Sequence, residues 1–132
     1  MYSFNKEDYM KRMEWYTQAR FGMFLHWGLY SIPARGEWMR SFEKLTDEEY
    51  GKYFEEFNPV DYDPKKWAKL AKKAGMKYMV LTAKHHDGFC LFDSGYTDFK
   101  ATNTKCGRDL IKEYVEAVRA EGLKVGLYYS LL

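Results

Sequence analysis

Residues 63–89 have the sequence DPKKWAKLAKKAGMKYMVLTAKHHDGF, which contains the signals of a helix, a tight turn and a strand in succession. Asp63 is a good N-cap, Pro64 suits the first helical position, and Gly75 suits the position just after a helix. Apolar residues between them share one helical face: Trp67, Leu70, Ala71 and Ala74. The apolar run 76–83 then predicts a buried strand. The segment therefore predicts a helix followed closely by a strand.

The same pattern extends in both directions along the chain. Downstream, apolar positions between residues 110 and 118 predict a second helix that ends at Gly122, and LKVGLYY at 123–129 predicts a strand. Upstream, FGMFLHWG at 21–28 is an apolar run bounded by glycine and predicts a buried strand. Strands that alternate with helices favour a parallel sheet with right-handed crossovers. The predicted fold class is therefore α/β.

Loop lengths bear on the kind of α/β fold. Long polar segments, including residues 84–108, follow the predicted strands, whereas the turns after the predicted helices are tight. This asymmetry is typical of a (β/α)₈ barrel, in which the loops after the strands build the site. An open doubly wound sheet shows the same alternation, so both architectures stay open at this point. No GxGxxG or P-loop pattern follows a strand, which disfavours nucleotide binding.

Two further helices are expected. Residues 5–17 are amphipathic, and Thr46 with Glu49 forms a possible capping box for a helix at 47–54. Three strands cannot close a barrel that needs eight strands and about 250 residues. The chain also stops directly after a strand that looks buried. We therefore expect residues 1–132 to be a truncated piece of a larger α/β domain, containing roughly its first three βα units, with no second domain.

Composition excludes several classes of protein. Hydrophobic residues make up 46% and charged residues 30% of the chain, as in globular proteins. The net charge is only +2 and the charges are interleaved, which argues against a nucleic-acid partner. No apolar stretch approaches the ~18 residues of a membrane span. A polar start without an export signal, together with the unpatterned Cys90 and Cys106, predicts free thiols in the cytoplasm.

All three histidines follow predicted strands: His26 after the first, and His85 with His86 after the second. Parallel strands end at the same edge of a sheet, so we expect the three imidazoles to share a rim. Imidazoles there can hold a metal ion, a phosphate or sugar hydroxyls. Adjacent histidines point to opposite faces if the strand continues through them, which disfavours a shared metal ion. Neighbouring sugar hydroxyls, spread over several ångström, fit such donors and acceptors better.

Other candidate residues lie on the same predicted rim. Glu37 and Trp38 place a carboxylate, which accepts hydrogen bonds from hydroxyls, beside an indole that can stack on a sugar. Asp87 either orients a histidine or caps the turn that Gly88 allows, and the sequence leaves both open. Tyr128 and Tyr129 end the third predicted strand, so one faces the barrel centre and the other faces away. The alternation does not show which of the two tyrosines faces the centre.

Long motifs carry a resemblance to a known family. They comprise WYTQARFGMFLHWG at 15–28, YSIP at 30–33, GEW at 36–38, LTAKHHDGF at 81–89, LFDS at 91–94 and GLYYS at 126–130. Together they resemble the start of family 29 α-L-fucosidases. The resemblance implies that residues 1–132 are the N-terminal portion of a (β/α)₈-like catalytic domain, which removes terminal α-linked L-fucose from glycans with retention of configuration. We expect no cofactor and no metal. The resemblance also implies a fucose pocket lined by His26, Glu37, Trp38, His85, His86 and Tyr128.

The resemblance places the catalytic carboxylates elsewhere. In the family the nucleophile is an Asp after a later strand and the acid/base is typically a Glu further on, so both are expected beyond Leu132 and none in this chain. Glu37 is expected as a substrate contact. A separately supplied C-terminal half, or other copies of the chain, are possible partners beside a fucosylated oligosaccharide or glycoconjugate. Two alternatives stay open: a non-catalytic sugar-binding or scaffold fragment, and a metal hydrolase that uses the three histidines.

Overall fold

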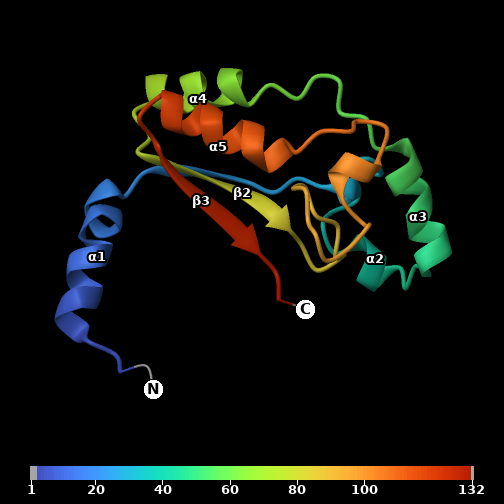
Figure 1. The fold of residues 1–132 in the computed structure, drawn as a ribbon, viewed down its shortest axis with the longest axis horizontal. Coiled ribbons are helices and arrows are strands. Elements are labelled where there is room, and N and C mark those ends of the chain that lie inside the picture. The colour runs from blue at the N-terminus through green and yellow to red at the C-terminus, as the bar shows by residue number, and fades with distance from the viewer. Residues whose placement is uncertain (1–2, 132) are drawn as a thin grey trace.

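A computed structural model describes residues 3–131, in which one parallel sheet forms the centre of the fold (Figure 1). Its strands are β1 (Gly22–Leu25), β2 (Tyr78–Lys84) and β3 (Lys124–Tyr129), hydrogen-bonded in the order β1-β2-β3. Both strand pairs are parallel. The alternation of strands and helices in the sequence is therefore confirmed, together with the α/β class.

The first strand is shorter than the predicted range 21–28. Beyond Leu25 the backbone leaves the ladder and bonds to a side chain instead: the Trp27 N–H donates to Thr82 Oγ1 over 2.9 Å, and the Thr82 hydroxyl donates to the Trp27 carbonyl over 2.6 Å. This exchange satisfies the backbone groups of Trp27 without a strand. It also ties the end of β1 to β2.

Helices α4 (Pro64–Lys73) and α5 (Leu110–Ala120) lie together over one face of the sheet (Figure 1). Between sheet and helices lies the core, which includes Ala68, Ala71, Met79, Leu81, Leu110, Tyr114 and Val118. The predicted cap of α4 is present, because Asp63 Oδ1 accepts from the Lys66 N–H over 3.0 Å. Gly75 has a φ of 86°, a left-handed conformation that favours glycine after a helix.

The segment between β1 and α4 carries α2 (Met39–Phe42) and α3 (Asp47–Glu56), with a short 3₁₀ turn η1 (Leu29–Ser31) before them. The predicted capping box of α3 is confirmed: the Glu49 N–H donates to Thr46 Oγ1, and Glu49 Oε2 accepts from the Thr46 N–H. The sequence did not predict α2. The long loop after β2 contains a second 3₁₀ turn, η2 (Ala101–Asn103).

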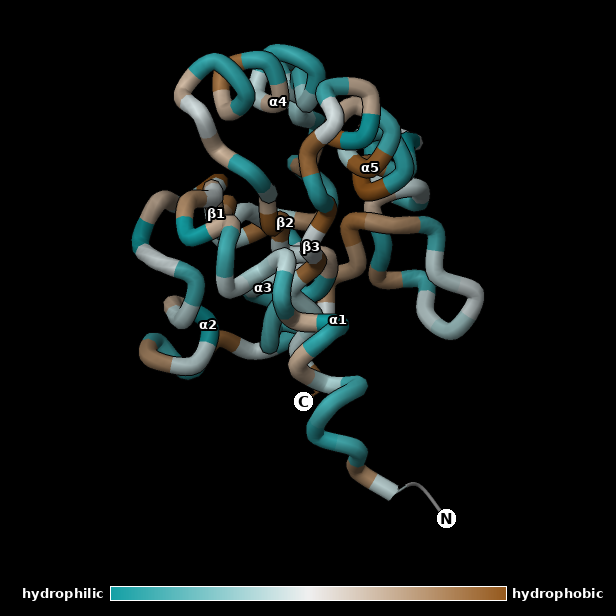
Figure 2. Tube along the Cα trace, turned by 90° about the vertical axis from the view of Figure 1, so that its left-hand side faces the viewer, coloured by the Kyte–Doolittle hydropathy of each residue, from teal (hydrophilic) through white to brown (hydrophobic). Residues whose placement is uncertain are grey.

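Helix α1 (Lys6–Ala19) projects from one end of the molecule, as Figure 1 shows, and Figure 2 shows that it is largely hydrophilic. None of its residues is buried. It touches the sheet through Trp15 and Tyr16, whose ring centroids lie 6.2 Å and 5.4 Å from that of Tyr78. The described residues form no helix that is both long and apolar enough to cross a membrane.

On the face of the sheet away from α4 and α5, two glycines lie close to side chains of β2. A Cβ atom on Gly22 would lie 2.4 Å from the Tyr78 ring, and one on Gly126 would lie 2.8 Å from Val80 Cγ2. Side chains at these two positions would collide with β2. Glycine therefore leaves room for the side chains of Tyr78 and Val80. Phe24, which pairs with Val80, remains 53% exposed on this face.

Candidate functional site

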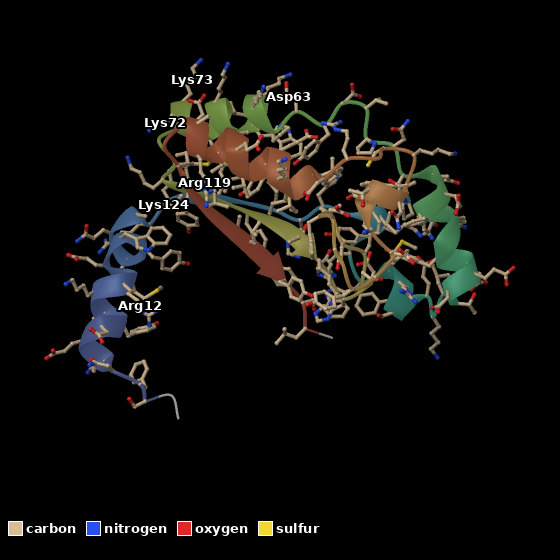
Figure 3. All side chains as sticks on the ribbon, in the orientation of Figure 1. Arg12, Asp63, Lys72, Lys73, Arg119 and Lys124 are labelled. Atoms are coloured by element: carbon tan, nitrogen blue, oxygen red, sulfur yellow. The ribbon has the colours of Figure 1, made fainter. Side chains whose placement is uncertain are left out.

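The carboxyl ends of the three strands bring the predicted side chains to one edge of the sheet. His26 follows β1, His85 and His86 follow β2, and Tyr128 lies at the end of β3. The loop after β1 returns to the same edge and adds Trp38. Four basic side chains labelled in Figure 3 lie toward the opposite edge, where the strands begin: Lys72, Lys73, Arg119 and Lys124.

Ring distances show that these side chains form one cluster. The centroid of His85 lies 5.2 Å from that of His26, 5.5 Å from that of Tyr128 and 5.6 Å from that of Trp38. His26 and Tyr128 are 5.5 Å apart, and Trp38 stacks on His86 at 4.6 Å. The five predicted rings therefore meet around His85, and we call His26, Trp38, His85, His86 and Tyr128 the ring cluster.

His85 is the buried member of the ring cluster, with 3% of its surface exposed. Burial first, and then the neighbouring imidazoles of His26 and His86, lowers the pKa of His85 below its ordinary value, while Glu37 acts in the opposite direction. Burial therefore favours the neutral form of His85. Its Nδ1 atom is buried and has no hydrogen-bond partner among the described residues. A buried polar atom without a protein partner calls for an explanation, and a bound ligand would supply one for this atom at the edge of the sheet.

His86 is exposed at the rim, and its ring is held from two sides. Trp38 stacks on its face with an interplanar angle of 28°, and Ser130 Oγ lies 2.6 Å from its Nδ1. The Nε2 atom remains available to a ligand. An imidazole with fixed plane and rotation is suited to directional hydrogen bonding with a hydroxyl group.

Glu37 lies beside the ring cluster and is half-buried. It lines a hollow of about 310 Å³ together with Trp38, Arg40, Ser41, Lys44, Leu45, His86 and Asp87. All six residues predicted to bind substrate are therefore brought to the same edge of the sheet. Their contact with a sugar stays a prediction.

The structure decides between the two interpretations of Asp87. Its carboxylate accepts from the Tyr50 hydroxyl over 2.8 Å and from the Phe89 N–H over 3.2 Å. Gly88 has a φ of 85°, as a tight turn requires. Asp87 therefore caps this turn and joins it to α3, and its carboxylate bonds to no histidine among the described residues. Burial raises the pKa of this carboxyl, and the bonds from Tyr50 and Phe89 act against that rise.

The two tyrosines at the end of β3 point in opposite directions. Tyr128 stacks on His85 with an interplanar angle of 25°. Tyr129 lies on the other side, where the Lys84 Nζ atom is 4.9 Å from its ring centroid. Tyr128 is thus the member of the ring cluster, as the resemblance implied. Trp27 also lies away from the cluster, stacked on Tyr62 at 5.2 Å.

Several residues that the sequence did not single out touch the ring cluster, among them Tyr30 and Ser130. Tyr30 is buried, and its ring lies 5.4 Å from His85. Ser130 bonds to His86. Both belong to the motifs YSIP and GLYYS, which were noticed for the resemblance but offered no separate chemical signal. Within residues 3–131, no group of three or more His, Cys, Asp or Glu side chains is arranged to hold a metal ion.

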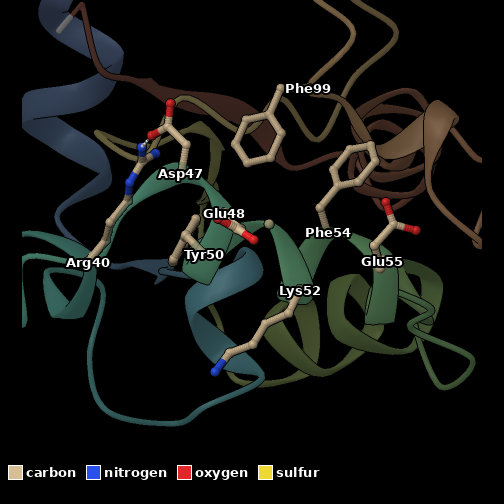
Figure 4. Close-up of a pocket in the computed structure, with 9 residues that line it drawn as sticks. Arg40, Asp47, Glu48, Tyr50, Lys52, Phe54, Glu55 and Phe99 are labelled. Carbon is tan, nitrogen blue, oxygen red and sulfur yellow. Dashed lines mark hydrogen bonds and ion pairs between the residues drawn. The ribbon is translucent and has the colours of Figure 1, made fainter.

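A larger hollow of about 540 Å³ runs along α3, lined at its ends by Arg40 with Asp47 and by Phe54 with Phe99 (Figure 4). It contains none of the six predicted residues. The ring cluster is the better candidate site because it contains the unpaired Nδ1 of His85 and the oriented ring of His86. Size alone does not indicate chemistry.

Comparison with known proteins places the chain in a family. The family model described as alpha-L-fucosidase matches residues 1–132. The chain belongs to the α-L-fucosidase family. Tissue alpha-L-fucosidase of Mus musculus is 36% identical over 135 residues, which cover 89% of this chain and 30% of that protein. The chain thus spans about 30% of the length of this curated relative.

Solved α-L-fucosidase structures agree with the fold. Alpha-L-fucosidase isoenzyme 1 from Paenibacillus thiaminolyticus is 70% identical, with a TM-score of 0.91, over 92% of this chain and 29% of that one. A Bacteroides thetaiotaomicron GH29 α-L-fucosidase, described as a trapped covalent intermediate in complex with 2-fluoro-fucosyl fluoride, is 41% identical, with a TM-score of 0.84. That match covers 89% of this chain and 29% of the Bacteroides chain. The mixed α/β arrangement is therefore the one found in GH29 fucosidases.

Proposed function

We propose that this chain forms one wall of the fucose-binding pocket of a retaining α-L-fucosidase, which removes terminal α-L-fucose from glycans. The single observation that carries the proposal is the meeting of Glu37 and the ring cluster at one sheet edge in a member of this family. In the proposed arrangement the sheet is the first part of a (β/α)₈ barrel, whose site lies at the carboxyl ends of its strands.

The chemistry of the wall suits a sugar ring. Indole and phenol rings offer apolar faces to the C–H groups of the sugar, and imidazole nitrogens and the Glu37 carboxylate exchange hydrogen bonds with its hydroxyls. Binding the terminal sugar of a glycan requires several such groups that are fixed relative to one another. The packing of Trp38 on His86 and of Tyr128 on His85 supplies that fixation.

We further propose that the nucleophile and the acid/base lie outside these 132 residues. A retaining glycosidase needs two carboxyl groups about 5–5.5 Å apart, one to attack and one to transfer a proton. Near the ring cluster the candidates are Glu37 and Asp87. Both oxygens of Asp87 already accept hydrogen bonds, from Tyr50 and from the Phe89 N–H. The covalent intermediate trapped in the Bacteroides thetaiotaomicron enzyme supports retention of configuration in this family.

The test is a chimera in which residues 1–132 replace the matching part of the Paenibacillus thiaminolyticus enzyme. We expect it to hydrolyse 4-nitrophenyl α-L-fucoside, and the 132-residue chain alone to bind fucose weakly without turnover. His85→Ala and Glu37→Ala should each lower kcat/KM by about 10- to 100-fold, the range for a lost hydrogen bond to a charged or buried partner.

Glu48→Gln, on the exposed side of α3, is the matched control and should leave kcat/KM unchanged. A folded chimera without activity would contradict the main proposal, and fucose binding without turnover would then favour the non-catalytic sugar-binding alternative. Turnover by the chain alone would contradict the placement of the two carboxylates.

A further inference from the structure

We infer that Ser130 is a positioning residue of this site, whose hydroxyl group holds His86 as the neutral tautomer that carries its proton on Nε2. The contact on which the inference is built is the 2.6 Å distance between Ser130 Oγ and His86 Nδ1. The role of His86 toward a sugar rests on the proposed function. The tautomer of His86 does not.

A β-bulge brings Ser130 to His86. Thr82 pairs with Tyr128, but the next pair is Lys84 with Tyr129, so β2 contains one extra residue. Bulges near sites change the direction in which a following side chain points. The backbone then fixes Ser130: its N–H donates to the Lys84 carbonyl over 2.9 Å, and its carbonyl accepts from Lys84 Nζ over 2.7 Å.

The alternation of β3 places the Ser130 side chain on the same face as Tyr128 and therefore toward the ring cluster. Trp38 restrains the plane of the His86 ring by stacking on it, and Ser130 restrains its rotation by bonding to one nitrogen. Together these contacts leave Nε2 as the nitrogen that faces a ligand.

The hydrogen-bond partners of Ser130 indicate which nitrogen of His86 carries the proton. Ser130 is 4% exposed, and His86 Nδ1 is the only partner of its hydroxyl group within residues 3–131. If Nδ1 carried a proton, the buried serine proton would have no acceptor, and an unpaired buried donor is costly. The serine O–H therefore donates to Nδ1, which fixes the proton of the neutral imidazole on Nε2. His86 then donates from Nε2 to an oxygen of the sugar.

The tautomer is measured by ¹⁵N NMR of the chimera with ¹⁵N-labelled histidine, with the His86 signals identified from their loss in His86→Gln. We expect an unprotonated Nδ1 and a protonated Nε2 in the parent chimera, and a mixture of tautomers in Ser130→Ala. A protonated Nδ1 in the parent, or unchanged signals in Ser130→Ala, would overturn the inference. This measurement needs no catalytic activity, so its outcome is separable from that of the proposed function.

A double-mutant cycle then separates positioning from a purely structural role. Ser130→Ala should lower kcat/KM about five- to tenfold when His86 is present, as expected for one hydrogen bond, and should cause no further loss in a His86→Ala background. Ser130→Thr keeps the hydroxyl and should recover most of the activity. Ser94→Ala, which removes another buried serine hydroxyl away from the cluster, is the control. Equal losses in both backgrounds would show that Ser130 acts independently of His86 and would overturn the positioning role.

Discussion

At the scale of single residues, the two adjacent histidines differ because of what each nitrogen meets. His85 is enclosed by aromatic rings, and its Nδ1 has no partner among the described residues. His86 is at the rim and is held by a serine. We therefore propose different roles for these adjacent imidazoles, His85 as a buried wall of the pocket and His86 as an oriented donor.

The lowered pKa of His85 has a consequence for stability. Its pKa in the folded state lies below the ordinary value of 6.5, so just below that pH the unfolded state binds more protons than the folded state. Stability therefore falls as the pH falls through this window. We expect the free energy of unfolding, from urea titrations between about pH 7.5 and about pH 5.5, to fall less steeply in His85→Gln than in the parent. An equal pH dependence of the unfolding free energy in the two proteins would contradict the lowered pKa of His85.

The hydroxyl groups of Tyr50 and Tyr114 form a matched pair for mutation. Both side chains are buried, but the Tyr50 hydroxyl donates to Asp87 Oδ2, and the Tyr114 hydroxyl has no partner among the described residues. Tyr50→Phe should destabilise the protein by about 1–3 kcal/mol, because it leaves a buried carboxylate short of a donor. Tyr114→Phe should be neutral or slightly stabilising. Chemical denaturation measures both, and equal costs would contradict this account of Asp87.

At the scale of elements, prediction from sequence succeeded where the signals are local. Helix α4 was located because Asp63 and Gly75 mark its ends, and α3 because Thr46 and Glu49 cap each other. Helix α2 was missed because it is a single turn, held by a distant contact in which Arg40 donates to the Asp87 carbonyl. The end of β1 was missed for a similar reason, since Trp27 bonds to a side chain 55 positions later.

For the candidate site, too, prediction from sequence depended on whether a residue's position is set by local signals or by long-range contacts. The histidines were placed on one rim because parallel strands end together, and the choice of Tyr128 came from the resemblance. Ser130 was not identified because its contact with His86 depends on a bulge that no local pattern announces. Long-range geometry, not composition, decided these positions.

Two glycines in different elements should respond oppositely to alanine. In β1 a Cβ on Gly22 would lie 2.4 Å from the Tyr78 ring, whereas in α3 a Cβ on Gly51 would meet nothing within 4 Å. We expect Gly22→Ala to lower the thermal midpoint, and Gly51→Ala to raise stability by about 0.5–1 kcal/mol because alanine restricts the unfolded chain and favours a helix. Stabilisation by Gly22→Ala would contradict the close packing of β1 on β2.

At the scale of the whole molecule, helices α4 and α5 cover one face of the sheet only in part, and no helix within residues 3–131 lies over the other face, so apolar side chains of the strands remain exposed. Phe24, Leu127 and Tyr129 are 53%, 48% and 52% exposed. In addition, β1 and β3 each have one side without a paired strand among the described residues. Exposed apolar groups and unpaired strand edges favour association.

We therefore expect the 132-residue chain to self-associate when studied alone. Its mass in sedimentation velocity should rise with concentration, and Leu127→Glu should shift it toward the monomer because a buried charge would oppose contact. Val60→Ser, in a loop where the side chain is 77% exposed, should have no effect. A monomer at every concentration would count against exposed sheet surface as a driver of association.

The connections between the strands also set the timing of folding. Contacts that join neighbouring strands link Trp27 to Thr82, 55 positions apart, and Lys84 to Ser130, 46 positions apart. The entropic free-energy costs of closing these two loops differ by only about 0.2 kcal/mol, so loop length favours neither pairing. The ring cluster combines residues that follow β1 and β2 with one at the end of β3, so it is complete only after both loops have closed. Sugar binding should consequently appear only in the last kinetic phase of refolding, on the millisecond-to-second scale typical of non-local strand pairing.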